Sequence, residues 1–391
     1  MLIRIYEQDA YVFEFEGKVT SVDNDWVSLD ATAFYPGGGG QVNDLGMICG
    51  LKVTDVKMKG DDILHKVPGH GMKKGDDVWC SVDWDRRYDL MKGHTSEHLL
   101  FGGLKRSVPE ICIVKIFISP ESKYVVVDRD VGWDDIRKAQ EFVNTAIKDN
   151  HSVTKSTMEK DDPDMETVRV KLDRIDDDLV TVVEIGDVDT AACGGIHVRE
   201  TEEIGAVLVD RKVSAGKDGF AVHFRVGNDA LVRSLELANT CVQMSEILGT
   251  RTEDSVKALQ NLKHDSDARK EQMKAALQRM VNDMRPETIG GIAVYSGIFE
   301  TDERKIITDA AEKVKNNGGI AVLLIKGDSL SVMMSSGSNR VDCSSVLKEV
   351  MGGAGGKGGG KKDFAQGGVQ DVTNADNILN DLLRSVKNAL E

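Results

Sequence analysis

The chain has 391 residues, which is enough for two or three domains of ordinary size. Hydrophobic residues make up 40% and charged residues 29% of it, which excludes a largely disordered protein, and no run of about 18 apolar residues predicts a membrane-spanning helix. The 50 Lys and Arg against 65 Asp and Glu give a net charge of −15, which argues against a broadly basic nucleic-acid-binding surface. The six Cys are scattered and predict no disulfide framework, so any that matter are expected to bind a metal.

Residues 1–90 predict an N-terminal β domain, which we expect to be a small barrel or sandwich. The start, MLIRIYEQDAYVFEFEG, alternates apolar and polar residues like a strand and has no signal-peptide core, so we expect a cytoplasmic protein. Between Phe34 and Gly46 lies FYPGGGGQVNDLG, whose four consecutive glycines exclude a helix or strand interior. The flanking aromatic residues and proline favour a fixed loop over a free linker. Its backbone can therefore approach another surface closely.

Residues 91–228 predict an α+β domain, with helices packed on a largely antiparallel sheet. Apolar residues at helical spacing predict a helix from about Asp89 that ends at Gly102 and Gly103, and GWDDIRKAQEFVNTAIKDN predicts a second helix. The run from Glu159 to Asp178 is dense in carboxylates and is interpreted as a solvated face. The predicted strands are ICIVKIFIS, KYVVVDRD, VRVKL, LVTVVEI, GAVLVDRKVS and FAVHFRVG.

Residues 229–285 and 286–391 predict a helical arm and a C-terminal α/β domain. Two charged helices separated by a GTRT turn indicate a helical hairpin or coiled-coil arm, which Pro286 ends. Strands and helices then alternate up to an amphipathic helix from Asn374 to Leu390. The predicted fold class is therefore α+β multidomain, with a β-barrel-like domain, an α+β domain, a helical hairpin arm and a C-terminal α/β domain.

Two pairs of residues have the spacing of metal ligands. His94 and His98 are four residues apart on a predicted helix, so both imidazoles lie on one face. Cys193 and His197 lie in CGGIH, where the two glycines favour a turn. Together the four residues predict a tetrahedral zinc site, although each pair alone is also compatible with ordinary polar or buried residues. The segment HTSEH fits a second pattern, the H-x-x-E-H signature of inverted zinc peptidases with Glu97 as general base.

The glycine-rich segment GGAGGKGGGKK near the C-terminus matches two phosphate-binding patterns incompletely. Gly353, Gly355 and Gly358 fit G-x-G-x-x-G, but the match follows a predicted helix, and too little chain remains for a βαβ unit. A P-loop is disfavoured because the residue after Lys361 is Lys362 and not Ser or Thr. What remains is a flexible basic turn with Lys357, Lys361 and Lys362, suited to phosphate or simply a surface loop.

Three segments resemble a known family when they are read in order. FYPGGGGQVNDLG, VDWDRRYDLMKGHTSEHLL and CGGIHVRETEEIG are similar to the editing domain of alanyl-tRNA synthetases and to the free-standing AlaX editing proteins. GGAGGKGGGKKDFAQGG resembles the C-terminal domain of those synthetases, which also occurs on DHH-type phosphoesterases. No segment resembles the aminoacylation domain and there is no DHH motif. The chain therefore looks like a long-form AlaX protein.

The resemblance implies an enzyme that hydrolyses tRNA(Ala) mischarged with serine or glycine, with Zn²⁺ held by His94, His98, Cys193 and His197. It also implies that Thr32 faces the side chain of the substrate, and Gln41 is expected to make polar contacts near the ester. Glu97 and Gly37 depart from the family pattern, since relatives often have a small or apolar residue and an acid at these positions.

Three questions stay open from the sequence. Zinc can activate a water or only orient the substrate, and four protein ligands would suit a structural site better than a catalytic one. A non-catalytic tRNA-binding or assembly protein with a structural zinc is therefore the alternative. The acidic charge does not indicate which basic surface binds tRNA, because residues 287–391 hold 12 Lys and Arg and 14 Asp and Glu. The arm and the C-terminal domain suggest a homodimer, and no membrane partner is expected.

Overall fold

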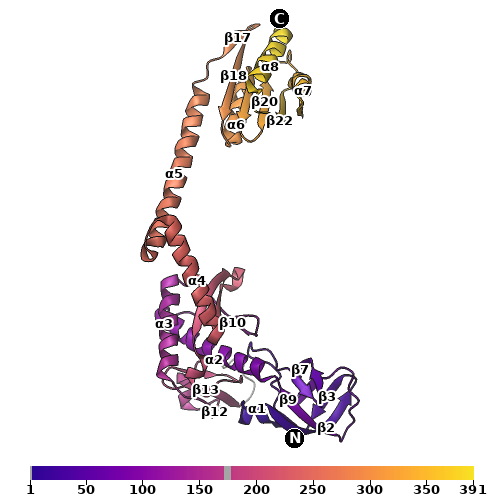
Figure 1. Ribbon diagram of the computed structural model, residues 1–391, viewed down its shortest axis with the longest axis vertical. Coiled ribbons are helices and arrows are strands. Elements are labelled where there is room, and N and C mark those ends of the chain that lie inside the picture. The colour runs from indigo at the N-terminus through magenta and orange to yellow at the C-terminus, as the bar shows by residue number, and fades with distance from the viewer. Residues whose placement is uncertain (1, 171–177) are drawn as a thin grey trace. The chain divides into compact units, whose positions relative to one another are not determined.

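The computed structural model describes residues 2–170 and 178–391, and the chain divides into two compact units, Met1–Met244 and Ser245–Glu391 (Figure 1). Part of the acidic run from Glu159 to Asp178 and part of the predicted strand VRVKL lie outside the described residues. Within the described residues, no helix combines the length and the apolar character needed to cross a membrane.

The first unit begins with a seven-stranded antiparallel sheet in the order β6-β5-β9-β2-β3-β8-β7. The strand Ile3–Arg4 (β1) pairs in parallel with Ala31–Thr32 (β4), and Ile5–Gln8 (α1) is a short helix where the sequence predicts a strand. The sheet confirms the predicted β-barrel-like domain. Its strands are Glu14–Asp23 (β2), Trp26–Leu29 (β3), Gly46–Ile48 (β5), Leu51–Val53 (β6), Asp55–Lys59 (β7), Asp62–Lys66 (β8) and Asp77–Val82 (β9).

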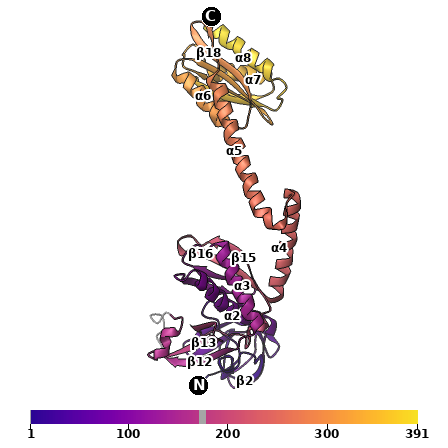
Figure 2. The ribbon, with the colours of Figure 1, turned by 90° about the vertical axis from the view of Figure 1, so that its left-hand side faces the viewer.

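Two long helices and two smaller sheets complete this unit. The helices Trp84–Ser107 (α2) and Trp133–Asp149 (α3) pack on each other (Figure 2). The predicted end of α2 at Gly102 and Gly103 is wrong. A Cβ on Gly103 would lie 3.0 Å from the Ala139 Cα of α3, so this glycine permits a close helix crossing and not a helix end. The two sheets have the strand orders β10-β11-β16-β15 and β12-β13-β14. Their strands are Ile113–Ile118 (β10), Lys123–Val127 (β11), Val153–Glu159 (β12), Leu179–Ile185 (β13), Asp189–Ala192 (β14), Val207–Ser214 (β15) and Phe220–Val226 (β16).

One apolar core runs through both parts of the first unit. It joins Val27 and Ile63 of the seven-stranded sheet to Leu99 of α2 and Val143 of α3, all fully buried. The domain boundary predicted at residue 90 falls inside α2. The division into four domains stays a prediction, but the core places the glycine-rich loop and α2 on one continuous scaffold.

The predicted arm is helical. Gly227–Leu248 (α4) and Ser255–Asn282 (α5) are helices, and the residues between them form a turn. Leu235 and Ile247 of α4 and Val256 and Met273 of α5 are exposed. The boundary between the two compact units falls within α4.

The second unit carries a six-stranded mixed sheet in the order β17-β18-β19-β20-β22-β21, which has helices on both faces. Ile320–Lys326 (β19) is buried on both sides, because Val322 packs in one apolar cluster with α7 and α8, and Leu323 in another with α6. This confirms the predicted α/β unit. Its other elements are Glu287–Ile289 (β17), Ile292–Glu300 (β18), Arg304–Asn316 (α6), Leu330–Ser336 (β20), Cys343–Gly353 (α7), Lys357–Gly360 (β21), Phe364–Val369 (β22) and Ala375–Leu390 (α8).

The lysine-bearing glycine segment is not the flexible turn that the sequence predicts. Its residues Lys357–Gly360 form the edge strand β21, antiparallel to β22, beneath helix α7. A Cβ on Gly358 would lie 3.0 Å from the Leu347 side chain of α7, and one on Gly356 would lie 2.6 Å from a backbone oxygen of β22. The glycines therefore let a helix lie directly on two strands. Lys357, Lys361 and Lys362 remain exposed at this edge.

Candidate metal centre and cleft

Helix α2 brings the first two predicted metal ligands together. It begins after Asp83, whose side chain accepts a hydrogen bond from the Arg86 N–H. His94 and His98 lie one turn apart and are buried, with ring centroids 5.4 Å apart. The i, i+4 spacing thus places both imidazoles on one face, as predicted from the sequence.

The second pair of ligands follows strand β14 in the turn that contains Cys193, Gly195 and His197. A Cβ on Gly195 would lie only 2.2 Å from the His94 ring, so only glycine allows this turn to approach α2. One ligand atom from each of the four residues lies within 4.8 Å of the others. The geometry brings together the four predicted residues, and a set of one thiolate and three imidazoles suits Zn²⁺.

Each histidine has a hydrogen-bond partner on the nitrogen that faces away from Cys193. His94 Nδ1 is 2.7 Å from Gln41 Oε1, His98 Nδ1 is 2.9 Å from Asp189 Oδ2, and His197 Nδ1 is 3.1 Å from Thr95 Oγ1. The Nε2 atoms of His94 and His197 each lie 3.4 Å from Cys193 Sγ. Nδ1–H groups that donate outward leave each Nε2 free as a metal ligand, which is the usual arrangement around protein zinc.

The charges of the cluster are also those of a metal site. Burial alone would raise the pKa of Cys193, but the neighbouring His94 and His197 bring it well below its usual value, which favours the thiolate. Burial lowers the pKa of His197 to about 3, so this ring is a neutral ligand. Burial also opposes charge on His98, but its hydrogen bonds to Asp189 and Cys193 raise its pKa to about 10, so this ring would release a proton on binding a metal. Asp189 therefore has the role of the carboxylate partner of a ligating histidine.

A cleft of about 870 Å³ opens beside the cluster. Three of the four ligands, His94, His98 and Cys193, line this cleft, whereas His197 lines a separate smaller pocket. One face of α2 contributes further lining residues at helical spacing: Glu97, Phe101 and Lys105. Gly39 and Gly40 lie on the wall of the cleft, with Lys115 and Ile116 of β10. The site therefore has an accessible side on which three ligands face a space large enough for a small organic group.

The glycine-rich loop is fixed at the cleft by its own backbone. Val42 N donates to Ile118 O, and Ile118 N donates to Gly40 O. Gly40 has φ +94°, and a Cβ there would lie 2.5 Å from Ile116 O, so the loop lies flush on β10. The prediction of a fixed loop is confirmed.

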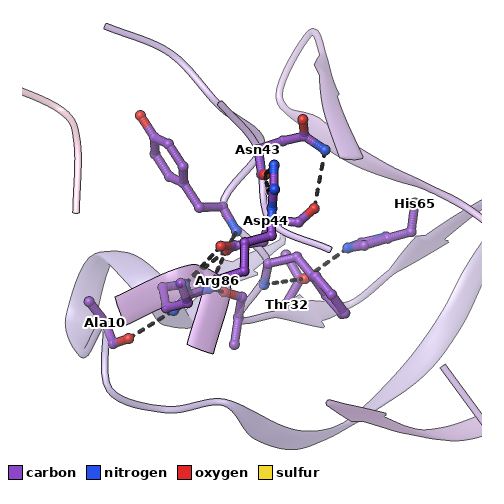
Figure 3. A network of polar contacts seen from close by, with 10 residues as sticks. Ala10, Thr32, Asn43, Asp44, His65 and Arg86 are labelled. Atoms are coloured by element: carbon purple, nitrogen blue, oxygen red, sulfur yellow. Dashed lines mark hydrogen bonds and ion pairs between the residues drawn. The ribbon is translucent and has the colours of Figure 1, made fainter. Parts of the chain in front are cut away.

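A buried ion pair holds the other end of this loop, and Figure 3 shows the network. Arg87 of α2 pairs with Asp44, and both side chains are fully buried. Asp44 also accepts from the Tyr35 N–H at 2.7 Å, and Arg87 donates to the carbonyl oxygens of Ala10 and Ala33. The pair thus ties the segment after the glycines to the helix that carries His94 and His98.

Three family models match separate parts of this chain. The family models for tRNA synthetases class II (A), for the threonyl and alanyl tRNA synthetase second additional domain, and for the DHHA1 domain match residues 7–86, 180–218 and 290–388. The chain is 27% identical to the alanyl-tRNA editing protein AlaX-L of Pyrococcus horikoshii, and the alignment covers 95% of each chain. The chain is a long-form relative of the alanyl-tRNA editing proteins.

The chain is also similar to alanine–tRNA ligases. It is 29% identical to that of Methanoregula boonei over 96% of its own length, and spans 42% of the ligase. The C-Ala domain of Aquifex aeolicus alanyl-tRNA synthetase matches 27% of this chain and 98% of that domain, with 25% identity and a TM-score of 0.24. The chain thus spans less than half of this ligase and nearly all of the AlaX-L protein.

Gln41 and Thr32, the two residues expected to contact the substrate, lie in different places. Gln41 lies at the metal cluster, where its Oε1 orients His94. Thr32 is fully buried and does not line the cleft. His65 Nδ1 lies 3.1 Å from Val27 O and must donate to it, so His65 Nε2 is an acceptor and the Thr32 hydroxyl donates to it at 2.9 Å (Figure 3). Thr32 Oγ1 also accepts from Phe34 N–H at 3.1 Å, which leaves it one free lone pair.

Several residues around the metal cluster were not predicted from the sequence. Asp189, Thr95 and His65 hold His98, His197 and Thr32, and each partner lies tens of residues away along the chain. Arg169 pairs with Asp189 at 2.8 Å and lines the cleft. None of them has a short-range motif. The spacing of Asp189 just before CGGIH is the one signal that could have suggested a carboxylate partner.

Proposed function

We propose that the protein is a zinc-dependent aminoacyl-tRNA deacylase that removes serine or glycine from mischarged tRNA(Ala). One observation carries the proposal: four ligand atoms from His94, His98, Cys193 and His197 lie within 4.8 Å of one another beside an open cleft. Similarity to the AlaX-L editing protein over nearly the whole chain supports the choice of substrate.

The residues that would hold zinc also determine which chemistry it can supply and from which side a substrate can reach it. The four side chains fit Zn²⁺, which supplies either polarisation of the ester carbonyl or a more acidic water. Because His197 lines a different pocket from the other three, the accessible side of the site is the side that a substrate or water could approach. Gln41 and Asp189 fix the rings of His94 and His98, so these ligands do not reorient when a substrate enters.

The charges around the cleft suit the 3′ end of a tRNA. Lys105 and Lys115 are exposed at the cleft, and Arg169 lines it as well. An aminoacylated 3′ end brings phosphates that such cations can bind, although the chain as a whole has a charge of −15. The tRNA contact at the catalytic end is therefore local, and its salt dependence is expected to be modest.

Selection of the amino acid would rest on Thr32. The free lone pair of its hydroxyl can accept a hydrogen bond from a seryl hydroxyl, which alanine lacks. Thr32 is buried and its O–H is donated to His65, so any role in selection is that of an acceptor. The protein would then prefer serine over alanine because the Thr32 oxygen is left without a donor when alanine is bound.

The second unit would hold the body of the tRNA. Lys357, Lys361 and Lys362 cluster at the exposed edge of its sheet and are suited to phosphates. Two linked contacts raise the effective concentration of the 3′ end at the cleft without new chemistry. We further propose a cytoplasmic protein that forms a homodimer through the arm and the C-terminal domain.

The leading alternative is a non-catalytic tRNA-binding or assembly protein with a structural zinc, which a set of four protein ligands would suit. An inverted-motif zinc peptidase accounts for Glu97, but it gives no role to CGGIH or to the fixed glycine loop. The open cleft beside the ligands favours the deacylase over a purely structural site.

Hydrolysis of purified Ser-tRNA(Ala), with Ala-tRNA(Ala) as the control substrate, tests the proposal. Serine should be released, alanine should be spared, and a chelator should abolish the release until zinc is restored. Binding of tRNA(Ala) without hydrolysis by the zinc-loaded protein would contradict the proposal and support the non-catalytic alternative.

A further inference from the structure

Glu97 is a buried acid whose role neither the fold nor the metal explains. It lies between the metal ligands of α2, is fully buried and lines the cleft. Neither of its oxygens has a hydrogen-bond partner among residues 2–170 and 178–391. A carboxylate taken out of water without a partner is costly, so a protein that keeps one at a cleft is expected to use it on a ligand.

The cations that line the cleft donate no hydrogen bond to Glu97 among the described residues. The Arg169 guanidinium attracts Glu97 through its charge, but its ion pair, at 2.8 Å, is with Asp189. Lys105 belongs to the same face of α2 as Glu97, but its side chain is exposed and forms no ion pair with it within the described part of the chain. Glu97 also lies outside the group of four residues whose ligand atoms converge. A hydrogen-bond donor for Glu97 therefore comes from what enters the cleft, and a cationic donor suits a carboxylate best.

We propose that Glu97 binds the α-ammonium group of the aminoacyl ester, an inference that rests on the proposed deacylase function. The ammonium is the cation at the charged end of an aminoacyl-tRNA, and it offers three N–H donors to the two free oxygens of Glu97. A charge-assisted hydrogen bond of this kind is strong where water is excluded. The cleft then has cations for the phosphates and the buried Glu97 carboxylate for the amine, a pattern complementary to the substrate.

This assignment predicts a specificity that the metal ligands alone do not give. A tRNA substrate whose α-amine is blocked, as in peptidyl-tRNA or N-acylated aminoacyl-tRNA, has a neutral amide in place of the ammonium. The protein should therefore not hydrolyse it. The competing role, that of general base in the H-x-x-E-H pattern, acts on water and would be indifferent to the α-amine.

The test changes the two partners one at a time. Nitrous acid converts seryl-tRNA(Ala) to glyceryl-tRNA(Ala), which has a hydroxyl in place of the amine and is nearly the same size. The wild-type protein should hydrolyse the seryl ester about 10- to 100-fold better than the glyceryl ester in single-turnover kcat/KM, corrected for the uncatalysed rates. Glu97→Gln should reduce this preference to within about 3-fold, mainly by slowing the seryl reaction. Asp85→Asn, which removes an exposed charge from the same helix, should leave the preference unchanged.

Two other outcomes would overturn the proposal. Equal loss of both reactions in Glu97→Gln would assign Glu97 to the water and not to the amine, and an unchanged preference would show that Glu97 does not contact the amine. Zinc content measured on the same preparations should stay at the wild-type level in Glu97→Gln, and a loss of zinc would mean that Glu97 supports the metal.

Binding separates this inference from the proposed function. The protein should bind 3′-seryl-amide adenosine, which cannot be hydrolysed, about 10-fold or more tightly than its glyceryl-amide counterpart, and Glu97→Gln should remove the difference. If the wild-type protein shows this difference but hydrolyses no Ser-tRNA(Ala), the deacylase proposal fails while the amine contact stands. If it hydrolyses Ser-tRNA(Ala) and binds both amides equally, the amine contact fails alone.

Discussion

The substitution His65→Gln should remove a large part of the acid sensitivity of the first unit. His65 is fully buried, donates from Nδ1 to Val27 O and accepts the Thr32 hydroxyl at Nε2, so it is held neutral. Burial lowers its pKa from 6.5 to about 4. Below pH 6.5 the unfolded chain takes up a proton at this residue and the folded chain does not, so the free energy of unfolding falls as pH decreases from 6.5 to 4.

The size of the effect follows from the shift in pKa. One pKa unit corresponds to about 1.4 kcal/mol, so a lowering from 6.5 to about 4 corresponds to roughly 3 kcal/mol of stability that is complete above pH 6.5 and lost by about pH 4. Glutamine cannot be protonated in this range, yet its amide oxygen can still accept from Thr32. His65→Gln will be less stable than wild type at neutral pH, since the donor to Val27 O is lost, but it should lack this part of the pH dependence.

Urea unfolding followed by tryptophan fluorescence, from pH 7.5 to pH 4, measures both curves. The wild-type advantage over His65→Gln should shrink by roughly 3 kcal/mol between these limits. Other acidic and basic groups titrate in both proteins, and their contributions cancel in the difference. Parallel curves, with a constant difference across this range, would refute a neutral buried His65 and with it the donor direction assigned to Thr32.

Three further predictions concern the cluster, Thr32 and the second unit. Elemental analysis should find one zinc per chain, and Cys193→Ala should lower the zinc content; full occupancy in a variant that lacks all four ligands would exclude the site. Thr32→Val should lower the free energy of unfolding by about 1–3 kcal/mol because it leaves His65 Nε2 unpaired. It should also slow the release of serine more than the release of glycine, and an equal slowing of both would show that Thr32 does not bind the seryl hydroxyl. Replacement of Lys357, Lys361 and Lys362 by Ala should weaken binding of whole tRNA and reduce its salt slope, while hydrolysis of an acceptor-stem mimic stays unchanged; unaltered affinity for whole tRNA would place the tRNA contact elsewhere.

The convergence of the four candidate metal ligands could be predicted from the sequence because each pair obeys a local rule. His94 and His98 share a helical face, and Gly194 and Gly195 turn the chain between Cys193 and His197. The partners of these ligands could not be predicted in the same way. Asp189 meets His98 across 91 residues, and Gln41 meets His94 across 53, and only the assembled sheets and helices determine such distances.

Glycine explains most of the errors in the local structure predicted from the sequence. The same residue can either break an element or allow another element to pack closely on it. The sequence predicts a helix end at Gly102 and Gly103 and a flexible basic turn that carries Lys357, Lys361 and Lys362. The structure has a helix crossing and an edge strand at these places. In both places the missing Cβ lets another element approach to about 3 Å, at Ala139 of α3 and at Leu347 of α7. Around Gly40 the prediction succeeds because the neighbouring aromatic residues and proline indicate a fixed loop.

The hydrogen bonding of the buried polar groups in the first unit indicates where its functional site is. Its largest fully buried charged side chain is Arg87, whose three nitrogens all donate to Asp44 or to the backbone oxygens of Ala10 and Ala33. Four buried side-chain polar atoms lack a hydrogen-bond partner among the described residues, and three of them belong to Gln41 at the metal cluster and Glu97 at the cleft. A chain that satisfies a buried arginine so completely elsewhere is not simply poorly packed at these two residues, since unpaired buried groups are rare in native proteins. Gln41 Nε2 and the Glu97 carboxyl group are therefore the positions at which we expect a ligand to bind.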